Sequence, residues 1–295
     1  MTPSPSIARN AAFGIVLTAT LSGACHAQEG PPAQARFAGG NDTFIGYSYA
    51  RNMHFPGSPD KVAMNIASVT TTGSFAYGHY AFNFNDNMTD SNDPEVNGSE
   101  GSQEVYTVGR VEWSAGKILG LGLGNGFVRD IGLTTGYEYS SKNDAYSAAA
   151  RMVIVGPTID LAVPRGYWNL TLGVRTEDNH NGLVFAPRHE LHFSPAWHFE
   201  SSWLSAFNLG RASTVFKGFA SITGPKGTDG FLNKTVTETL VQASWLLDAG
   251  ALAGHPRTFY VGPGYQYWNH MFGTPSYETQ GTRRSAAMFV SEAHF

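Results

Sequence analysis

Histidine and carboxylate side chains gather in the stretch RHELHFSPAWHFES, residues 188–201. Glu190, His192 and His198 are residue types that ligate transition metals, and they share one face if the stretch is an extended strand. A strand rises about 3.3 Å per residue, so Glu190 and His198 lie roughly 26 Å apart. One metal ion cannot bridge that distance, and we therefore expect no metal site here.

The same stretch could also place a nucleophile beside a base. Ser194 follows His192 by two residues on the same strand face, and a hydrolase needs such a pair with a third orienting group. However, same-face neighbours are this close in any strand, and the sequence has no G-x-S-x-G nucleophile elbow. We also find no cofactor motif. We therefore expect no enzyme and no cofactor, with an outer-membrane barrel hydrolase kept as an alternative.

The elements that carry these residues are predicted from the period of the apolar side chains. Leu191, Phe193, Trp197 and Phe199 alternate with the polar residues, which a strand separates and a helix would mix. Most such segments are long enough to cross a bilayer as a tilted strand, for which roughly 9–11 residues are needed. Twelve of them lie near residues 42–53, 61–72, 74–86, 102–114, 125–138, 146–162, 166–177, 187–200, 212–223, 234–247, 257–270 and 283–295.

The composition restricts the class of protein further. Charged residues make up 14% of the chain, against about 25% in soluble proteins, while aromatic residues make up 13% and there are 34 glycines. Low charge with many aromatic residues and glycines is typical of a transmembrane β-barrel, although a secreted β-sandwich shares it. The net charge of −4 and the lack of a basic cluster argue against a nucleic-acid partner.

The N-terminal residues have the organisation of a secretory signal. Arg9 precedes the apolar run AAFGIVLTATLS, and a small-x-small site ends at Ala27. We predict a cleaved signal peptide over 1–27, a periplasmic segment over 28–41 and a β-barrel over 42–295. Cys25, the only cysteine, is lost with the signal, which excludes disulfides and thiolate chemistry. A lipoprotein is the alternative, but SGAC lacks the leucine expected three residues before the cysteine.

The predicted connections alternate between short and long. TTG is the predicted turn between the second and third strands, and PRG lies between the sixth and seventh. Polar loops over 86–101, 224–233 and 272–284 follow odd-numbered strands, which is typical of long external loops and short periplasmic turns. SSWLSAFNLGR, residues 201–211, is longer than expected there, and either extends the strands or forms a turn of helix.

The last segment, MFVSEAHF, keeps the strand period up to Phe295. A strand that uses its final side chain indicates an end that is tied in, because a bilayer cannot satisfy an unpaired strand edge. The predicted fold is therefore all-β: a transmembrane antiparallel barrel of about twelve strands, an up-and-down meander with both termini periplasmic.

Four stretches carry a family resemblance. YVGPGYQYWNHMFG (260–273) resembles the penultimate strand of the nucleoside-specific channel-forming outer-membrane porins, the Tsx-type channels, with its Y-x-Y-W followed by F-G. WLLDAGAL (245–252), GPTIDLAVPRGYWNLTLGVR (156–175) and VFKGFASITGPKG (215–227) are similar to other strands and turns of that family, in the same order. RVEWSAGKILG (110–120) departs from the family's P-R-x-S pattern.

The resemblance implies a narrow channel in the bacterial outer membrane that passes nucleosides by diffusion. Aromatic side chains stack on bases, while carboxylates and amides hydrogen-bond sugar hydroxyls and base edges. We expect a monomer whose partners are lipid and a small solute. An adhesin or phage receptor without specific transport is a further alternative.

If the apolar face of each strand meets lipid, the polar face lines the lumen, since charges are costly on the lipid side. Tyr106, Gln266 and Trp268 are the leading candidates for solute contact, because they suit stacking and amide recognition. The full set of candidates is Tyr106, Gln266, Trp268, Glu104, Arg110, Asp130, Glu190 and Lys217.

Overall fold

The computed structural model describes residues 41–93, 101–121, 123, 126–143, 147–182 and 186–295. The predicted signal peptide and the predicted periplasmic segment up to residue 40 lie outside these residues. Described strands are β1 (Asp42–Met53), β2 (Val62–Phe75), β3 (Gly78–Thr89), β4 (Gln103–Ser114), β5 (Val128–Lys142), β6 (Ala149–Leu161), β7 (Gly166–His180), β8 (Glu190–His192), β9 (Ala196–Leu209), β10 (Ala212–Thr223), β11 (Glu238–Asp248), β12 (Phe259–Asn269) and β13 (Arg283–His294). Described helices are α1 (Ala115–Leu119), α2 (Ala249–Leu252) and the 3-10 turn η1 (Met271–Gly273).

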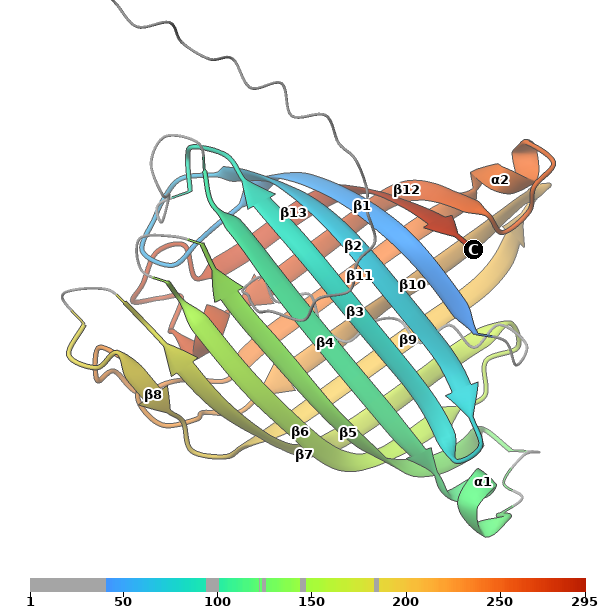
Figure 1. Cartoon of the computed structure of the whole chain (residues 1–295), viewed down its shortest axis with the longest axis horizontal. Coiled ribbons are helices and arrows are strands. Elements are labelled where there is room, and N and C mark those ends of the chain that lie inside the picture. Colours follow the sequence, from blue (N-terminus) through green and yellow to red (C-terminus); the bar gives the residue numbers. More distant parts are fainter. Residues whose placement is uncertain (1–40, 94–100, 122, 124–125, 144–146, 183–185) are drawn as a thin grey trace, which may run out of the picture.

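The strands form one closed antiparallel sheet (Figure 1). Of its 13 strands, the short β8 pairs only with the end of β7, on the edge where β9 pairs with the rest of β7, so twelve strands make the wall. Each wall strand pairs with its neighbour in the sequence, and β1 pairs with β13 from Phe44↔His294 to Ala50↔Met288. The backbone N–H of Phe295 donates to the carbonyl of Thr43 at 3.0 Å. The predicted barrel, its strand number and its tied-in C-terminal strand are confirmed.

The faces of the wall have the chemistry of a barrel surrounded by lipid. Along β7, Trp168, Leu172 and Val174 are exposed, while Asn169, Thr171 and Arg175 between them are buried. Exposed apolar side chains also mark the outer face of the other wall strands, and the buried charged side chains of the wall face the inside. This is the reverse of a soluble barrel, because a charge facing lipid would be costly and an apolar side chain facing lipid is not.

Aromatic side chains collect at the end of the barrel where β1 begins and β13 ends. This end carries the starts of β1 and β3 and the ends of β2 and β13, together with α1 and α2 (Figure 1). Rings of this kind at the lipid–water boundary anchor a barrel at its correct depth. Exposed aromatic residues near this rim are Tyr77, Trp113, Phe127, Trp168, Phe207, Phe216, Trp245, Phe259 and Phe295.

One predicted connection differs from the structure, and another follows one of its two predicted outcomes. TTG lies inside β2, and the turn to β3 is formed by residues 76 and 77. Alternation alone does not distinguish a strand residue from a turn residue when both are small and polar. Residues 201–211 extend β9 up to Leu209 and leave a two-residue turn, which was one of the two predicted outcomes.

The interior of the barrel is divided into an apolar side and a polar side. Val62, Met64 and Ile66 of β2 and Met288 and Val290 of β13 belong to one buried apolar cluster. The inward residues of β3 to β7 and of β9 are mostly amides, hydroxyls and charges. Among the described residues, no helix is long and apolar enough to span a membrane.

Candidate solute-binding lumen

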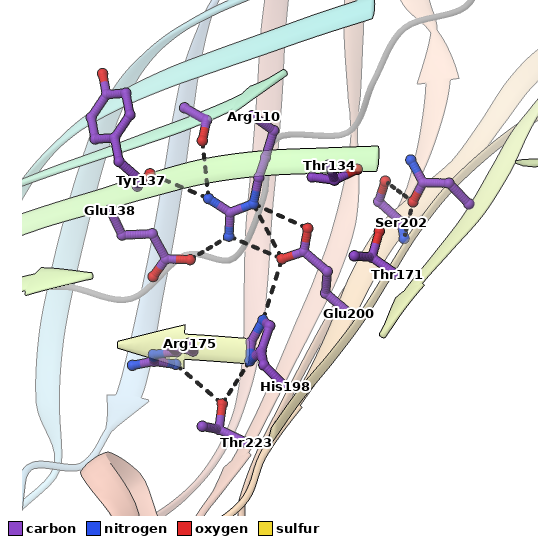
Figure 2. Close-up of polar contacts among 12 residues, drawn as sticks. Arg110, Thr134, Tyr137, Glu138, Thr171, Arg175, His198, Glu200, Ser202 and Thr223 are labelled. Carbon is purple, nitrogen blue, oxygen red and sulfur yellow. Dashed lines mark hydrogen bonds and ion pairs between the residues drawn. The ribbon is translucent and has the colours of Figure 1, made fainter. Parts of the chain in front are cut away.

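An ion pair crosses the interior between Arg110 of β4 and Glu200 of β9 (Figure 2). Arg110 Nε lies 3.0 Å from Glu200 Oε1, and Nη2 lies 3.0 Å from Oε2, which is a two-pronged contact. Nη2 also donates to Glu138 Oε1 of the neighbouring β5, and Nη1 donates to the carbonyls of Gly109 and Tyr137. Because β5, β6 and β7 separate β4 from β9, the pair links two distant parts of the wall.

Polar contacts continue from Glu200 toward the end of the barrel away from the termini. Glu200 Oε2 lies 3.4 Å from His198 Nε2, and His198 Nδ1 lies 2.9 Å from the hydroxyl of Thr223. Arg175 Nη1 donates to the same hydroxyl at 3.2 Å, as Figure 2 shows, and Nη2 donates to Glu177 at 2.8 Å. These side chains are all buried, so the polar layer is a continuous part of the interior.

The network ends at Lys226, in the loop between β10 and β11. Lys226 Nζ lies 2.5 Å from Glu177 Oε1. Three cations, Arg110, Arg175 and Lys226, thus face the three carboxylates of Glu138, Glu177 and Glu200. Such pairing removes the cost of a lone buried charge at each of these six groups.

A glycine makes room for the central guanidinium. Gly136 of β5 is the register partner of Arg110. A Cβ at Gly136 would lie 2.5 Å from Arg110 Cδ and 2.9 Å from Nε, closer than real carbon contacts. The absence of a side chain on β5 therefore allows Arg110 to lie along the wall and reach both carboxylates.

Tyr106 and Trp268 lie in two separate polar clusters. Tyr106 is fully buried, and its hydroxyl donates to Glu138 at 2.6 Å, beside the Arg110 ion pair. Trp268 donates from Nε1 to Glu238 at 2.8 Å, and the guanidinium of Arg284 lies 5.4 Å from its ring centre. Both rings are inward, as predicted, but each is held by a carboxylate on the wall.

Gln266 connects two strands beside Trp268. It donates to Gln242 of β11 at 2.7 Å and accepts from Arg284 Nη1 at 3.0 Å. The second candidate cluster is therefore a corner of amides, an arginine and an indole on β11, β12 and β13.

The loop between β1 and β2 folds into the mouth of the barrel. Phe55 is buried, with Lys142 Nζ 4.6 Å and the Arg284 guanidinium 5.2 Å from its ring centre. These are cation–π contacts on one ring. Arg284 Nη2 also donates to the carbonyl of His54 at 2.8 Å. Partial burial, followed by the charges of Arg284 and Lys61, keeps the pKa of His54 below its ordinary value.

The remaining predicted residues have different positions. Glu104 of β4 is inward and buried. Lys217 is inward and lies 2.5 Å from Glu292 of β13. Asp130 lies near the terminal rim, where its carboxylate accepts from Ser114 Oγ and from the N–H of Gly116 at the start of α1.

The prediction that Glu190 lines the lumen is wrong. Glu190 belongs to β8, its side chain is exposed, and Oε1 lies 2.6 Å from His180 Nδ1. Its neighbour His192 is exposed as well and contacts Asp178 at 2.6 Å. The period of 188–201 was correct, but the segment is split by residues 193–195, so only its second half enters the wall.

Several interior residues were not among the predicted candidates. Glu177 follows Arg175 by two residues on an inward face, and alternation would have identified it. Lys226 could not be found in this way, because it lies in a loop that folds back over the barrel. Asn83, Asn85 and Asn87 alternate on β3 and are all buried. Asn83 and Asn85 belong to the predicted strand over 74–86, whereas Asn87 falls in the predicted loop over 86–101.

The comparisons with known proteins identify no family. No family model matches the chain, and no curated protein matches it. Among solved structures, the chain is similar to the translocator domain of autotransporter NalP from Neisseria meningitidis, with a TM-score of 0.47, 10% identity, and 88% of this chain and 90% of that chain covered. It is also similar to the β domain of the Bordetella autotransporter BrkA (TM-score 0.39, 8% identity, 87% and 100% covered). A bacterial polysaccharide outer membrane secretin matches with TM-score 0.39, 8% identity, and 87% and 99% covered.

The closed wall and its apolar exterior define the class of this chain as a transmembrane β-barrel of the outer-membrane type. What the barrel carries depends on the side chains of its interior.

Proposed function

We propose that this chain is an outer-membrane channel for the passive diffusion of small uncharged solutes, with nucleosides as the first candidates. The observation that carries the proposal is the ion pair from Arg110 to Glu200 across the interior. It places a polar contact across the interior, beside the buried apolar cluster. Eight strands leave only space for side chains and sixteen leave a wide channel, so a twelve-stranded wall suits a narrow one.

The balance of charges in this layer favours neutral solutes. An ion that enters must give up bound water. It gains little interaction energy in return, because the carboxylates and cations of the network already pair with each other. A neutral solute can exchange hydrogen bonds with the same groups one at a time, and weak binding of this kind permits release. The resemblance of 260–273 and the other stretches to nucleoside-specific porins is the reason for placing nucleosides first. The proposal includes no catalytic step, and it has the protein act as a monomer in lipid.

Single-channel conductance tests the proposal. The purified protein is inserted into a planar bilayer, and adenosine or thymidine is added in steps, with ribose and glucose as matched sugars. We expect a small, steady conductance that nucleosides reduce and free sugars do not. A conductance indifferent to nucleosides would contradict the specificity, and inserted protein without conductance would contradict the channel itself.

A further inference from the structure

Three asparagines form a strip along β3 on the inner face of the barrel. Asn83, Asn85 and Asn87 are 6%, 0% and 0% exposed, while Phe84 and Met88 between and beyond them face outward. Same-face residues are about 6.6 Å apart along a strand, so the strip extends over roughly 13 Å of the wall.

These amides lack the partners that buried amides normally have. Neither the nitrogen nor the oxygen of Asn85 or of Asn87 makes a hydrogen bond, and the oxygen of Asn83 makes none. Buried polar groups are nearly always hydrogen-bonded, since an unmade bond costs stability. A strip of five such atoms is therefore costly to the barrel alone and requires an explanation outside the fold.

The surroundings of the strip identify the chemistry of a fitting ligand. On one side, Asn87 pairs with the apolar Ile66 of β2. Farther along β2, Ser68 pairs with Asn85 and Thr70 pairs with Asn83. The amide nitrogen of Asn83 donates to the Thr70 hydroxyl at 2.8 Å. On the other side, Asn85 pairs with Tyr106 and Asn87 with Glu104 of β4, whose inward face is polar. The Asn87 end of the strip thus lies at the boundary between the apolar side and the polar side of the interior.

We propose that Asn83, Asn85 and Asn87 are a binding strip for an uncharged ring solute that has an apolar face and a hydrogen-bonding edge. The edge must both donate and accept, because each free amide offers a nitrogen donor and an oxygen acceptor. Hydroxyls and base edges of nucleosides meet this requirement, and the ring covers the methyl and thioether groups of β2. The inference adds a binding site to the proposed channel. It rests on the proposed function for the passage of the solute, but not for the binding of the solute.

Equilibrium binding in detergent tests the strip separately from conduction. Adenosine is the probe, and mannitol, which has hydroxyls but no ring, is its comparison, both measured by titration calorimetry on the full protein. The test variant is N85L/N87L. The matched control is N65L on β2, because Asn65 faces outward and accepts from the Tyr47 hydroxyl at 2.7 Å.

We expect adenosine to bind the native protein and mannitol not to bind. N85L/N87L should bind adenosine about tenfold more weakly, whereas N65L should bind like the native protein. Because the replaced amides have no partner, N85L/N87L should keep or raise the temperature at which the barrel unfolds on a gel.

Unchanged adenosine affinity in N85L/N87L, or no adenosine binding by the native protein, would contradict the proposed binding strip. A fall in the unfolding temperature of N85L/N87L below that of N65L would also overturn it, by showing a structural role for the amides. If adenosine binding requires Asn85 and Asn87 but the inserted protein shows no conductance, the binding strip would be supported and the proposed channel contradicted.

Discussion

Arg110 and Glu200 meet inside the barrel through two contacts of 3.0 Å, although 90 residues separate them in the chain. Both side chains are buried. Their contact fixes the positions of β4 and β9 relative to each other, which no backbone pairing does, because these strands are not neighbours. The mechanical and functional properties of the interior should therefore respond strongly to either residue.

Replacing the arginine tests this dependence. R110M leaves the carboxylates of Glu138 and Glu200 without their main partner, and breaking a buried pair on one side costs about 3–5 kcal/mol. We expect a lower midpoint of urea unfolding, followed by tryptophan fluorescence in lipid vesicles. R151M, at an exposed position of β6, is the control and should unfold like the native protein. Equal midpoints for the two variants would show that the ion pair adds no stability.

The glycine beside this arginine should be nearly as sensitive. G136A places a methyl group 2.5 Å from Arg110 Cδ, and crowding of this kind costs about 1–3 kcal/mol. In the double variant R110A/G136A the total loss of stability should be smaller than the sum of the losses in R110A and in G136A, because the clash needs the arginine side chain beyond Cγ. G126A is the control, since a Cβ there has no atom nearer than 4.0 Å. Full additivity in the urea midpoints would contradict the contact.

The docked loop between β1 and β2 should loosen in acid. The pKa of His54 is held below its ordinary value of about 6.5, so the docked loop binds a proton less readily than the free loop. Docking is then most stable above this ordinary value and weakens as the pH falls through it. After correction for the intrinsic pH dependence of amide exchange, residues 54–61 should be less protected at about pH 5 than at about pH 7.5. H54Q should remove this difference, and a pH dependence that persists in H54Q would point to another group.

The final residue should contribute in two separable ways. Deleting Phe295 removes the N–H bond to the carbonyl of Thr43, which is worth about 0.5–1.5 kcal/mol, together with the exposed ring. F295A removes the ring alone and keeps the bond. We expect the deletion to lower stability by about 1 kcal/mol more than F295A does, as judged from urea titrations monitored by the heat-dependent gel mobility of the barrel. Identical titrations for the two variants would show that the bond contributes nothing.

Strand positions could be predicted because alternation is a local property. In β13, exposed Phe289 and buried Val290 occupy the faces that the sequence predicts, and no knowledge of the partner strand is needed. Turn positions were less certain, since TTG is small and polar and yet continues β2. Glu190 shows the same limitation. Residues 193–195 interrupt the strand, yet the alternation of apolar and polar residues is the same before and after them.

The candidate site could be predicted only in part. Alternation placed Arg110, Tyr106 and Trp268 inside, which the structure confirms. It could not tell that Arg110 contacts Glu200, since that contact depends on how far the sheet curves before it closes. Lys226 could not be predicted for a related reason. It lies in a loop that folds over the mouth of the barrel, and such a loop has no alternating pattern in the sequence.

The pairing of β1 with β13 has a consequence for how the molecule assembles. Most of the wall's pairings join strands that follow each other along the chain, and such hairpins form quickly because little chain entropy is lost. The seam instead brings Phe44 to His294, close to the full length of the barrel domain. The curled sheet must therefore be almost complete before its two edges can join, and closing the seam is expected to be the slow, last step of insertion.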